Sequence, residues 1–291
     1  MLSDSHRVPK FQGVYHEPFA GSLAVYFWIV SRSDFPFHAR LADINLRLVR
    51  TYQEIKAEPV QVWEGLRELI DGFERASDAS AFYYRTREDF NANYPRGDAP
   101  RFMFLMATGW NGVYRTNSSG KFNVPFGNNV KTPRFPTKKE IEAASMAFEY
   151  ADIRACSWET SLSSARQGDF IFLDPPYLTD GDSDSDIYDG NHAFGFADQE
   201  KLAVELSSLQ IRGIDFLLTN GYSPKLVELY RDFGLAVDVI ASRRSISSKG
   251  NERGETAELV VTPGNLEVKM QDYVSDFDLN FKLLRRDERN E

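Results

Sequence analysis

The sequence has one cysteine, Cys156, among its 291 residues. A single thiol excludes a disulfide within the chain and cannot supply the cysteine cluster of a structural zinc site. We therefore expect Cys156 to be a small apolar residue of the core.

Long hydrophobic runs are also absent. No apolar run approaches the roughly 20 residues needed to cross a bilayer. Residues 1–7 are polar and lack the apolar segment of a secretory signal, which predicts a cytoplasmic location without a membrane partner. The apolar fraction of 42% and the charged fraction of 26% are typical of a soluble globular protein. The length allows one large domain or two modest ones.

Positive charge is scarce overall, because the formal net charge is −9. This balance argues against a nucleic-acid partner, but the charge is unevenly distributed. Seven basic residues and one acid lie between Arg101 and Glu140, and four more basic residues lie between Arg243 and Arg253. Such stretches can bind phosphates. They can also be solvated surfaces, which is the commoner meaning of clustered charge alone.

Strand and helix patterns alternate in the two outer parts of the chain and predict an α/β fold. The first unit reads as a strand at 14–17, a glycine turn and a helix at 23–30. A second strand at 39–42 ends at Asp43 and leads into a helical pattern up to Ile55. The later part predicts strands at 169–173, 214–219, 236–240 and 258–262, with helices at 198–209 and 224–233.

The middle of the chain has a different pattern. Helical stretches at 63–73 and 141–150 enclose a segment from Gly109 to Gly127 that is rich in Gly, Asn, Phe and Arg. This composition predicts loops and short hairpins. We interpret the middle as an inserted domain that meets the substrate. The predicted boundaries are 1–56 for the first part of the core, 57–150 for the insert, 151–265 for the catalytic part of the core and 266–291 for a C-terminal tail.

The segment Asp174-Pro175-Pro176-Tyr177 follows a buried-strand pattern. It therefore stands at the carboxyl end of a strand, where open α/β sheets bind ligands. The prolines hold the segment extended and stiff. A carboxylate, a carbonyl and an aromatic face suit a flat, polar-edged substrate such as a nucleobase. These four residues alone leave open a simple strand-ending turn.

Asp43 occupies the corresponding place after the second strand. Acids at this place hold ribose hydroxyls in such folds, because a carboxylate accepts two hydrogen bonds. A helix cap is the commoner role of aspartate before a helix. The glycine turn upstream and the Asp174 motif downstream favour cofactor binding.

An acidic stretch at 180–191 imitates a calcium-binding loop. Its sixth position is Ser185 rather than glycine, and its twelfth is Asn191 rather than glutamate. We therefore expect no metal, and interpret the stretch as a loop over the active site.

Five motifs in this order resemble the Dam-type (D12 class) DNA adenine-N6 methyltransferases, over roughly residues 11–262. They are Glu17-Pro18-Phe19-Ala20-Gly21, Leu41-Ala42-Asp43-Ile44-Asn45, the segment from Asn111 to Gly127, Asp174-Pro175-Pro176-Tyr177 and Arg243-Arg244-Ser245-Ile246-Ser247-Ser248. The resemblance implies a Rossmann-like S-adenosylmethionine-dependent methyltransferase sheet with an inserted, mostly helical target-recognition domain. It implies a monomer that methylates a flipped-out adenine in double-stranded DNA, with GATC as the expected target.

The resemblance also implies residue roles. Asp174 and the carbonyl of Pro175 would accept hydrogen bonds from the adenine amino group, and Tyr177 would stack on the base. The implied catalytic residues are Asp174, Pro175, Pro176 and Tyr177. The implied cofactor-binding residues are Glu17, Pro18, Phe19, Ala20, Gly21, Asp43, Glu159 and Asp174. The implied DNA contacts are Arg115, Asn117, Lys121, Asn123, Arg134, Arg244, Ser245 and Ser247.

The sequence departs from the family pattern at four places. Trp158 and Glu159 stand where an acid of relatives often contacts the adenine of the cofactor, and Glu159 is the expected substitute. The lysine-containing, glycine-rich strip that helps relatives to bind the cofactor is missing before Phe11, so either the sequence is shortened at its amino end or the protein holds the cofactor without that strip. Leu23 stands where relatives have a second glycine, and we expect its side chain to crowd or reposition the cofactor. Thr116 stands where relatives carry an aromatic residue. A DNA-binding protein of methyltransferase fold with weakened or lost cofactor binding therefore remains an alternative. Methylation of RNA or of a protein amide is a third, although Asp174 replaces the asparagine usual in amide-modifying relatives.

Overall fold

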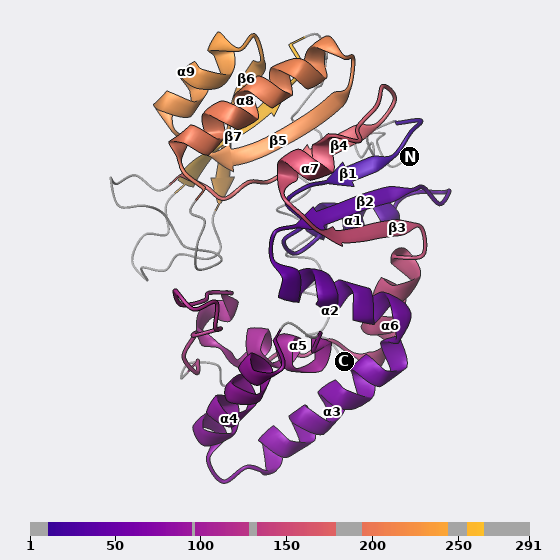
Figure 1. Cartoon of the computed structure of the whole chain (residues 1–291), viewed down its shortest axis with the longest axis vertical. Helices are drawn as coiled ribbons and strands as arrows, with labels where there is room; N and C mark the ends of the chain where they lie inside the picture. Colours follow the sequence, from indigo (N-terminus) through magenta and orange to yellow (C-terminus); the bar gives the residue numbers. More distant parts are fainter. Residues whose placement is uncertain (1–10, 95–96, 128–132, 179–193, 244–254, 265–291) are drawn as a thin grey trace.

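The computed structural model describes residues 11–94, 97–127, 133–178, 194–243 and 255–264. Their centre is a seven-stranded sheet with the order β3-β2-β1-β4-β5-β7-β6 (Figure 1). The strands are β1 Tyr15–Glu17, β2 Ala39–Asp43, β3 Ala151–Ala155, β4 Phe170–Leu173, β5 Asp215–Gly221, β6 Ala236–Arg243 and β7 Glu255–Thr262. The first five are parallel, and β7 runs antiparallel to both β5 and β6. The predicted α/β sheet is confirmed.

Helices follow most of the strands and fill the middle of the chain. They are α1 Ala24–Val30, α2 Leu46–Ala57, α3 Pro59–Arg75, α4 Ala79–Ala92, α5 Ala99–Thr108, α6 Lys138–Ala147, α7 Trp158–Leu162, α8 Phe196–Ile211 and α9 Pro224–Asp232. Local capping explains where several begin. Asn45 accepts hydrogen bonds from the first turn of α2, and Thr137 forms a capping box with Glu140 at α6. No helix among the described residues is both long enough and apolar enough to cross a bilayer.

Two apolar clusters cover the two faces of the sheet. One packs α7, α8 and α9 against strand residues such as Ile171 and Phe216. The other begins under Tyr15 and Leu41 and continues through α2 into α3, α4 and α5, where it includes Phe104. Figure 1 shows α3, α4 and α5 beyond α2, on the side away from the sheet. The middle of the chain therefore shares a continuous core with the sheet, and the boundaries at 57 and 150 remain predictions.

Strand β3 and the helices α4, α5 and α7 were not predicted from the sequence. Strand β3 pairs with β2 at the sheet edge, where only part of it is buried. A half-buried edge strand lacks the continuous apolar run of a central strand. Helices α4 and α5 begin at Asp78 and Asp98, whose side chains accept hydrogen bonds from the first turn. The Asp98-Ala99-Pro100 sequence is a start signal that could have revealed α5.

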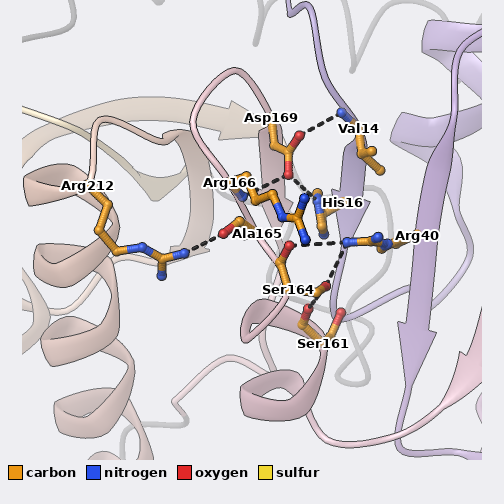
Figure 2. Close-up of polar contacts among 9 residues, drawn as sticks. All are labelled: Val14, His16, Arg40, Ser161, Ser164, Ala165, Arg166, Asp169 and Arg212. Atoms are coloured by element: carbon orange, nitrogen blue, oxygen red, sulfur yellow. Dashed lines mark hydrogen bonds and ion pairs between the residues drawn. The ribbon is translucent and has the colours of Figure 1, made fainter.

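A buried pair joins β1 to the turn before β4 (Figure 2). His16 Nε2 lies 3.0 Å from Asp169 Oδ2, and the backbone amides of Val14 and Arg166 donate to the same carboxylate at 2.8 and 2.9 Å. Burial lowers the pKa of His16, although its hydrogen bond to Asp169 opposes the shift. The neutral ring then donates its Nε2–H to Asp169. Since β1 and β4 are neighbours, the pair fixes the two strands whose ends carry the Glu17 and Asp174 motifs.

Replacing Asp169 by alanine is expected to lower the free energy of unfolding by about 2–3 kcal/mol, because buried donors lose their acceptor. Urea unfolding followed by circular dichroism measures the change. Asp152→Ala is the matched control, since Asp152 pairs with the exposed Arg154 on β3, and we expect a change below about 0.5 kcal/mol there. Equal effects of the two substitutions would contradict the assigned role of Asp169.

Candidate active site

The carboxyl ends of β1, β2 and β4 lie at one edge of the sheet, because these strands are parallel. Strand β1 lies between β2 and β4, so the strand order reverses at this place. Such a switch point is where open α/β sheets bind ligands. The chain leaves β1 through Glu17-Pro18-Phe19-Ala20-Gly21, β2 ends at Asp43, and β4 leads into Asp174. The structure therefore brings the three predicted strand-end motifs to one edge.

Asp43 holds the turn that follows β1. The Gly21 N–H donates to Asp43 Oδ2 at 3.0 Å, and the Asn45 N–H donates to Asp43 Oδ1 at 2.8 Å. The Tyr52 hydroxyl donates to the Gly21 carbonyl at 2.5 Å, so α2 also secures the turn. The cap of α2 is Asn45, so the alternative role of Asp43 as the cap of this helix is excluded. Asp43 thus fixes both the turn after β1 and the start of α2 at this edge.

Leu23 lies in the core, against the expectation that it crowds the cofactor. Its side chain is fully buried in the apolar cluster beneath the sheet. It precedes α1 with φ 55° and ψ 27°, a left-handed conformation that glycine adopts more readily than leucine. The left-handed backbone turns the side chain inward and leaves Gly21 and Ser22 exposed. A leucine in this conformation costs on the order of 1 kcal/mol, which its burial offsets.

Leu23→Gly is expected to lower the free energy of unfolding by about 2 kcal/mol, because the lost apolar packing outweighs the relieved backbone strain. Calorimetric titration should give a dissociation constant for S-adenosylmethionine within about twofold of wild type. A much tighter constant would mean that the leucine does crowd the cofactor.

Glu17 lies beneath the turn. Its side chain is 2% exposed, and the Tyr15 hydroxyl donates to Glu17 Oε2 at 2.7 Å. Burial raises the pKa of Glu17 to about 8, and the nearby Asp174 charge adds to the shift while the Tyr15 hydrogen bond opposes it. At neutral pH Glu17 is therefore mostly a neutral acid. Pro18 and Ala20 are also buried, so within this motif Phe19 and Gly21 provide the accessible surface.

Asp174 leaves β4 beside the next strand. The Thr219 hydroxyl of β5 donates to Asp174 Oδ1 at 2.7 Å, because the parallel register places Leu218 against Leu173. Asp174 is an exposed residue as a whole, but the desolvation of its carboxyl group by the surrounding protein raises the pKa of Asp174 to about 6. The charge of Glu258 adds to this rise, and the Thr219 hydrogen bond opposes it. The sequence did not identify Thr219, because its role depends on strand pairing.

The rest of the Asp174 motif is neither helix nor strand. Pro175 is buried, whereas Pro176 and Tyr177 are half-buried. The segment thus has the non-helical course that its prolines predict. The acidic stretch at 180–191 lies outside the described residues.

Aromatic rings form one wall at this edge. Phe19 stacks on Trp158 with ring centroids 6.4 Å apart, and Phe194 meets Phe19 edge-on at 5.6 Å. Trp158 begins α7, and the predicted Glu159 is exposed in the first turn of that helix. On the β2 side, Ile44 directly follows Asp43 and is 54% exposed. The sequence analysis assigned Phe19 and Glu159 to the cofactor site but not Trp158, Phe194 or Ile44, although large apolar residues immediately after strand ends were a usable signal.

Cys156 follows β3 at the same edge. Its amide donates to the Asp43 carbonyl, and its side chain is half-buried, which corrects the expected place in the core. Across the ranges that the structure describes, no three His, Cys, Asp or Glu side chains are grouped to hold a metal.

Residues 109–127 form the insert hairpin, with antiparallel bridges between Gly109 and Phe126 and between Thr116 and Phe122. Asn117 Oδ1 accepts the amides of Ser119 and Lys121 and so closes the turn. Loops and a short hairpin were predicted here, and they are confirmed.

The predicted DNA contacts of the insert hairpin differ in exposure. Arg115 and Lys121 are exposed, and Arg115 donates to Asn123 at 3.1 Å. Thr116 is buried, so it takes no surface role in this conformation. Trp110 is 43% exposed on the same segment, and the sequence analysis did not single it out.

The remaining predicted DNA contacts lie elsewhere. Arg134 is exposed and pairs with Glu140 at 3.1 Å. Arg244, Ser245 and Ser247 lie outside the described residues.

Comparisons with known proteins agree with this geometry. Residues 5–243 match the profile of the family described as D12 class N6 adenine-specific DNA methyltransferase. The chain is 32% identical over 265 residues to the DNA adenine methylase of Escherichia coli K12, covering 89% of this chain and 90% of the relative. It is 33% identical over 253 residues to the retron Ec67 DNA adenine methylase of Escherichia coli, covering 85% and 82%. It is 29% identical over 261 residues to the type II methyltransferase M1.LlaDCHI of Lactococcus lactis subsp. cremoris, covering 88% of each chain.

Proposed function

The chain belongs to the D12 class of N6 adenine-specific DNA methyltransferases, and from this premise we propose that it methylates an adenine flipped out of duplex DNA, with GATC as its target. The observation that carries the proposal is the position of Asp174 at the end of β4, beside the turn that Asp43 holds at the end of β2. One site for an amino group and one for a nucleoside cofactor thereby share the switch-point edge. Flipping exposes the amino group, which duplex DNA otherwise hides.

The cofactor of this family, S-adenosylmethionine, fits the residues at the edge. Asp43 would hold the ribose hydroxyls, and the exposed Gly21 backbone would lie against the methionine part. Phe19, Trp158 and Ile44 offer apolar surface for the adenine ring, with Glu159 near its polar edge. When bound, the cofactor supplies a methyl group on a positively charged sulfur.

Asp174 positions the target amino group. Its Oδ1 takes the Thr219 hydroxyl, which orients the carboxylate so that Oδ2 can accept one N6 hydrogen. The Pro175 carbonyl would accept the other hydrogen, and Tyr177 would stack on the base. Holding both hydrogens aims the nitrogen lone pair at the methyl group, so positioning supplies most of the catalysis. The by-products are a neutral thioether and a proton from the amino group.

DNA contacts are proposed for the insert hairpin. Arg115 and Lys121 suit guanine or phosphate, and Asn123 adds an amide beside Arg115. Trp110 offers an exposed ring that can stack on a base. Arg134, Arg244, Ser245 and Ser247 would contact the backbone, and Asn117 would hold the turn as well as face the DNA.

Sequencing that detects N6-methyladenine in DNA from cells expressing the chain tests this function. Methylation confined to GATC supports the proposal, methylation confined to another sequence contradicts the proposed target, and the absence of methylation in the presence of folded protein contradicts the activity. The alternative of lost cofactor binding has weaker support now, because Leu23 lies in the core. Calorimetry with S-adenosylmethionine decides between the two.

The activity is expected to fall as the pH decreases through about 6. Asp174 must be ionised to accept the amino hydrogen, and its pKa is raised to about 6, so the activity is expected to be lost near that pH.

Thr219→Val removes the hydrogen bond that lowers the pKa of Asp174. The acid limb of kcat/KM should therefore move to higher pH, and kcat should fall about tenfold. The pH profiles of both proteins measure the shift. Thr86→Val, which removes a hydroxyl bonded to Phe82 in α4, should leave the limb in place.

A further inference from the structure

A hydrogen-bonded bridge joins α2 to the insert hairpin. Arg47 lies in the first turn of α2 and is only 6% exposed. Its Nη1 donates to Asn91 Oδ1, on α4, at 3.0 Å. The Asn91 side chain makes two hydrogen bonds to the backbone of Phe122 in the hairpin. Its Oδ1 accepts the Phe122 N–H at 2.9 Å, and its Nδ2 donates to the Phe122 carbonyl at 3.0 Å. One arginine thus connects α2 to the hairpin backbone through a single side chain.

The Arg47 guanidinium has little freedom to move. It lies over the ring of Phe90 at 4.5 Å and over the ring of Tyr94 at 4.8 Å. A buried guanidinium that loses its hydrogen-bond acceptor destabilises the protein, because the desolvation of a charged group is then no longer compensated. We therefore expect Arg47 and Asn91 to move together when either helix shifts.

The other end of the bridge is the cofactor edge. The backbone N–H of Arg47 donates to Asn45 Oδ1, and the backbone N–H of Asn45 donates to Asp43 Oδ1. Further along α2, the Tyr52 hydroxyl holds the carbonyl of Gly21. A ligand that changes the position of Asp43 or the Gly21 turn therefore acts on α2, and through Arg47 on the hairpin.

We propose that Arg47 is a positioning residue that couples the cofactor to DNA: a cofactor held at Asp43 fixes α2, and Arg47 and Asn91 then hold the insert hairpin in its DNA-binding position. This inference rests on the proposed function, because it takes Asp43 as a cofactor residue and the hairpin as a DNA contact. Coupling of this kind is reciprocal, so each ligand tightens the binding of the other by the same factor.

The hairpin has a second anchor that supplies a matched control. Arg87 of α4 donates to the Val124 carbonyl at 2.9 Å, and the Tyr83 hydroxyl donates to the same carbonyl at 3.0 Å. Arg87 also lies over the ring of Tyr84 at 4.8 Å. It therefore resembles Arg47 in charge, aromatic contact and hairpin contact, but its contacts lie within the insert. Loss of Arg87 should loosen the hairpin without disconnecting it from the cofactor edge.

The experiment measures the dissociation constant of a GATC-containing duplex by fluorescence anisotropy, with and without saturating sinefungin, an unreactive cofactor analogue. In wild type the analogue is expected to tighten duplex binding about tenfold. Arg87→Met should weaken binding in both conditions and keep that ratio. Arg47→Met should reduce the ratio to below threefold, and Arg47→Lys, which keeps a buried charge and a donor, should restore part of it.

Two results would overturn the proposal: a wild-type ratio near one, or an Arg47→Met ratio of threefold or more. Thermal unfolding checks that each variant is folded. If Arg47→Met does not fold, Asn91→Ser breaks the same hydrogen bond from the other side, and the same threshold applies. Failure of the proposed function can be distinguished from failure of the Arg47 coupling. In the first case the wild-type protein would bind no cofactor analogue or would transfer no methyl group to the duplex.

Discussion

Asp174→Ala is expected to reduce kcat for methyl transfer by about 10³-fold, which corresponds to roughly 4 kcal/mol in the activation barrier. The carboxylate is the proposed acceptor that holds the adenine amino group, and Thr219 orients it from the neighbouring strand. An alanine leaves that amino group without its anionic acceptor at the moment when the nitrogen must become nucleophilic. Single-turnover transfer of a labelled methyl group measures the change.

Two measurements separate this role from a structural one. The dissociation constants of Asp174→Ala for cofactor and for DNA should stay within about threefold of wild type, because the substitution changes a residue that is exposed as a whole. Asp238→Ala, at an exposed position of β6, is the matched control and should leave kcat unchanged. Activity of Asp174→Ala within tenfold of wild type, about 1.4 kcal/mol, would show that the assigned role is wrong.

Asp43→Ala is expected to raise the dissociation constant for S-adenosylmethionine about 100-fold, or roughly 2.7 kcal/mol. The carboxylate has two functions in this interpretation, since it would accept the ribose hydroxyls and it also fixes the Gly21 and Asn45 amides. Charge-assisted hydrogen bonds of this kind contribute about 1.5–3 kcal/mol each. Calorimetric titration of the free protein with the cofactor provides the measurement.

Asp78→Ala is the control for Asp43→Ala. Asp78 caps α4 by accepting the Ala81 amide at 2.9 Å, so its loss destabilises the start of that helix by about 1 kcal/mol. Its effect on cofactor affinity should be negligible. If both variants bound the cofactor equally well, Asp43 would be a structural residue of the turn and nothing more.

Much of the fold could be predicted because central parallel strands are continuous apolar runs. Strand β4 is buried at each of its four residues, and its sequence Phe170-Ile171-Phe172-Leu173 shows this directly. Strand β3 has two exposed residues among five, and its polar residues Asp152 and Arg154 interrupt any continuous apolar run. The other edge strand, β6, was predicted because it contains three β-branched apolar residues, Val237, Val239 and Ile240. Apolar runs thus identified the strands rich in such residues, whereas the more polar edge strand β3 was missed.

The candidate site could be predicted in its positions but not in its orientations. Both Glu17 and Leu23 belong to the turn after β1, and the sequence assigned both side chains to the cofactor site. Glu17 is 2% exposed beneath the turn, and the left-handed backbone of Leu23 directs its side chain into the core. Spacing along a turn gives the order of residues, but the backbone angles decide which face each one takes.

The sequence by itself determined the order of strands and helices around the switch point, the placement of Asp43 and Asp174 at strand ends, and the resemblance to adenine-N6 methyltransferases. These properties depend on residues that are close together in the chain. Only the tertiary structure decided the contacts that orient the site: Gly21 with Asp43 across 22 positions, Arg47 with Asn91 across 44, and His16 with Asp169 across 153. A hydrogen bond requires its two atoms within about 3 Å, and for such distant residues only the packing of the sheet and helices sets that distance.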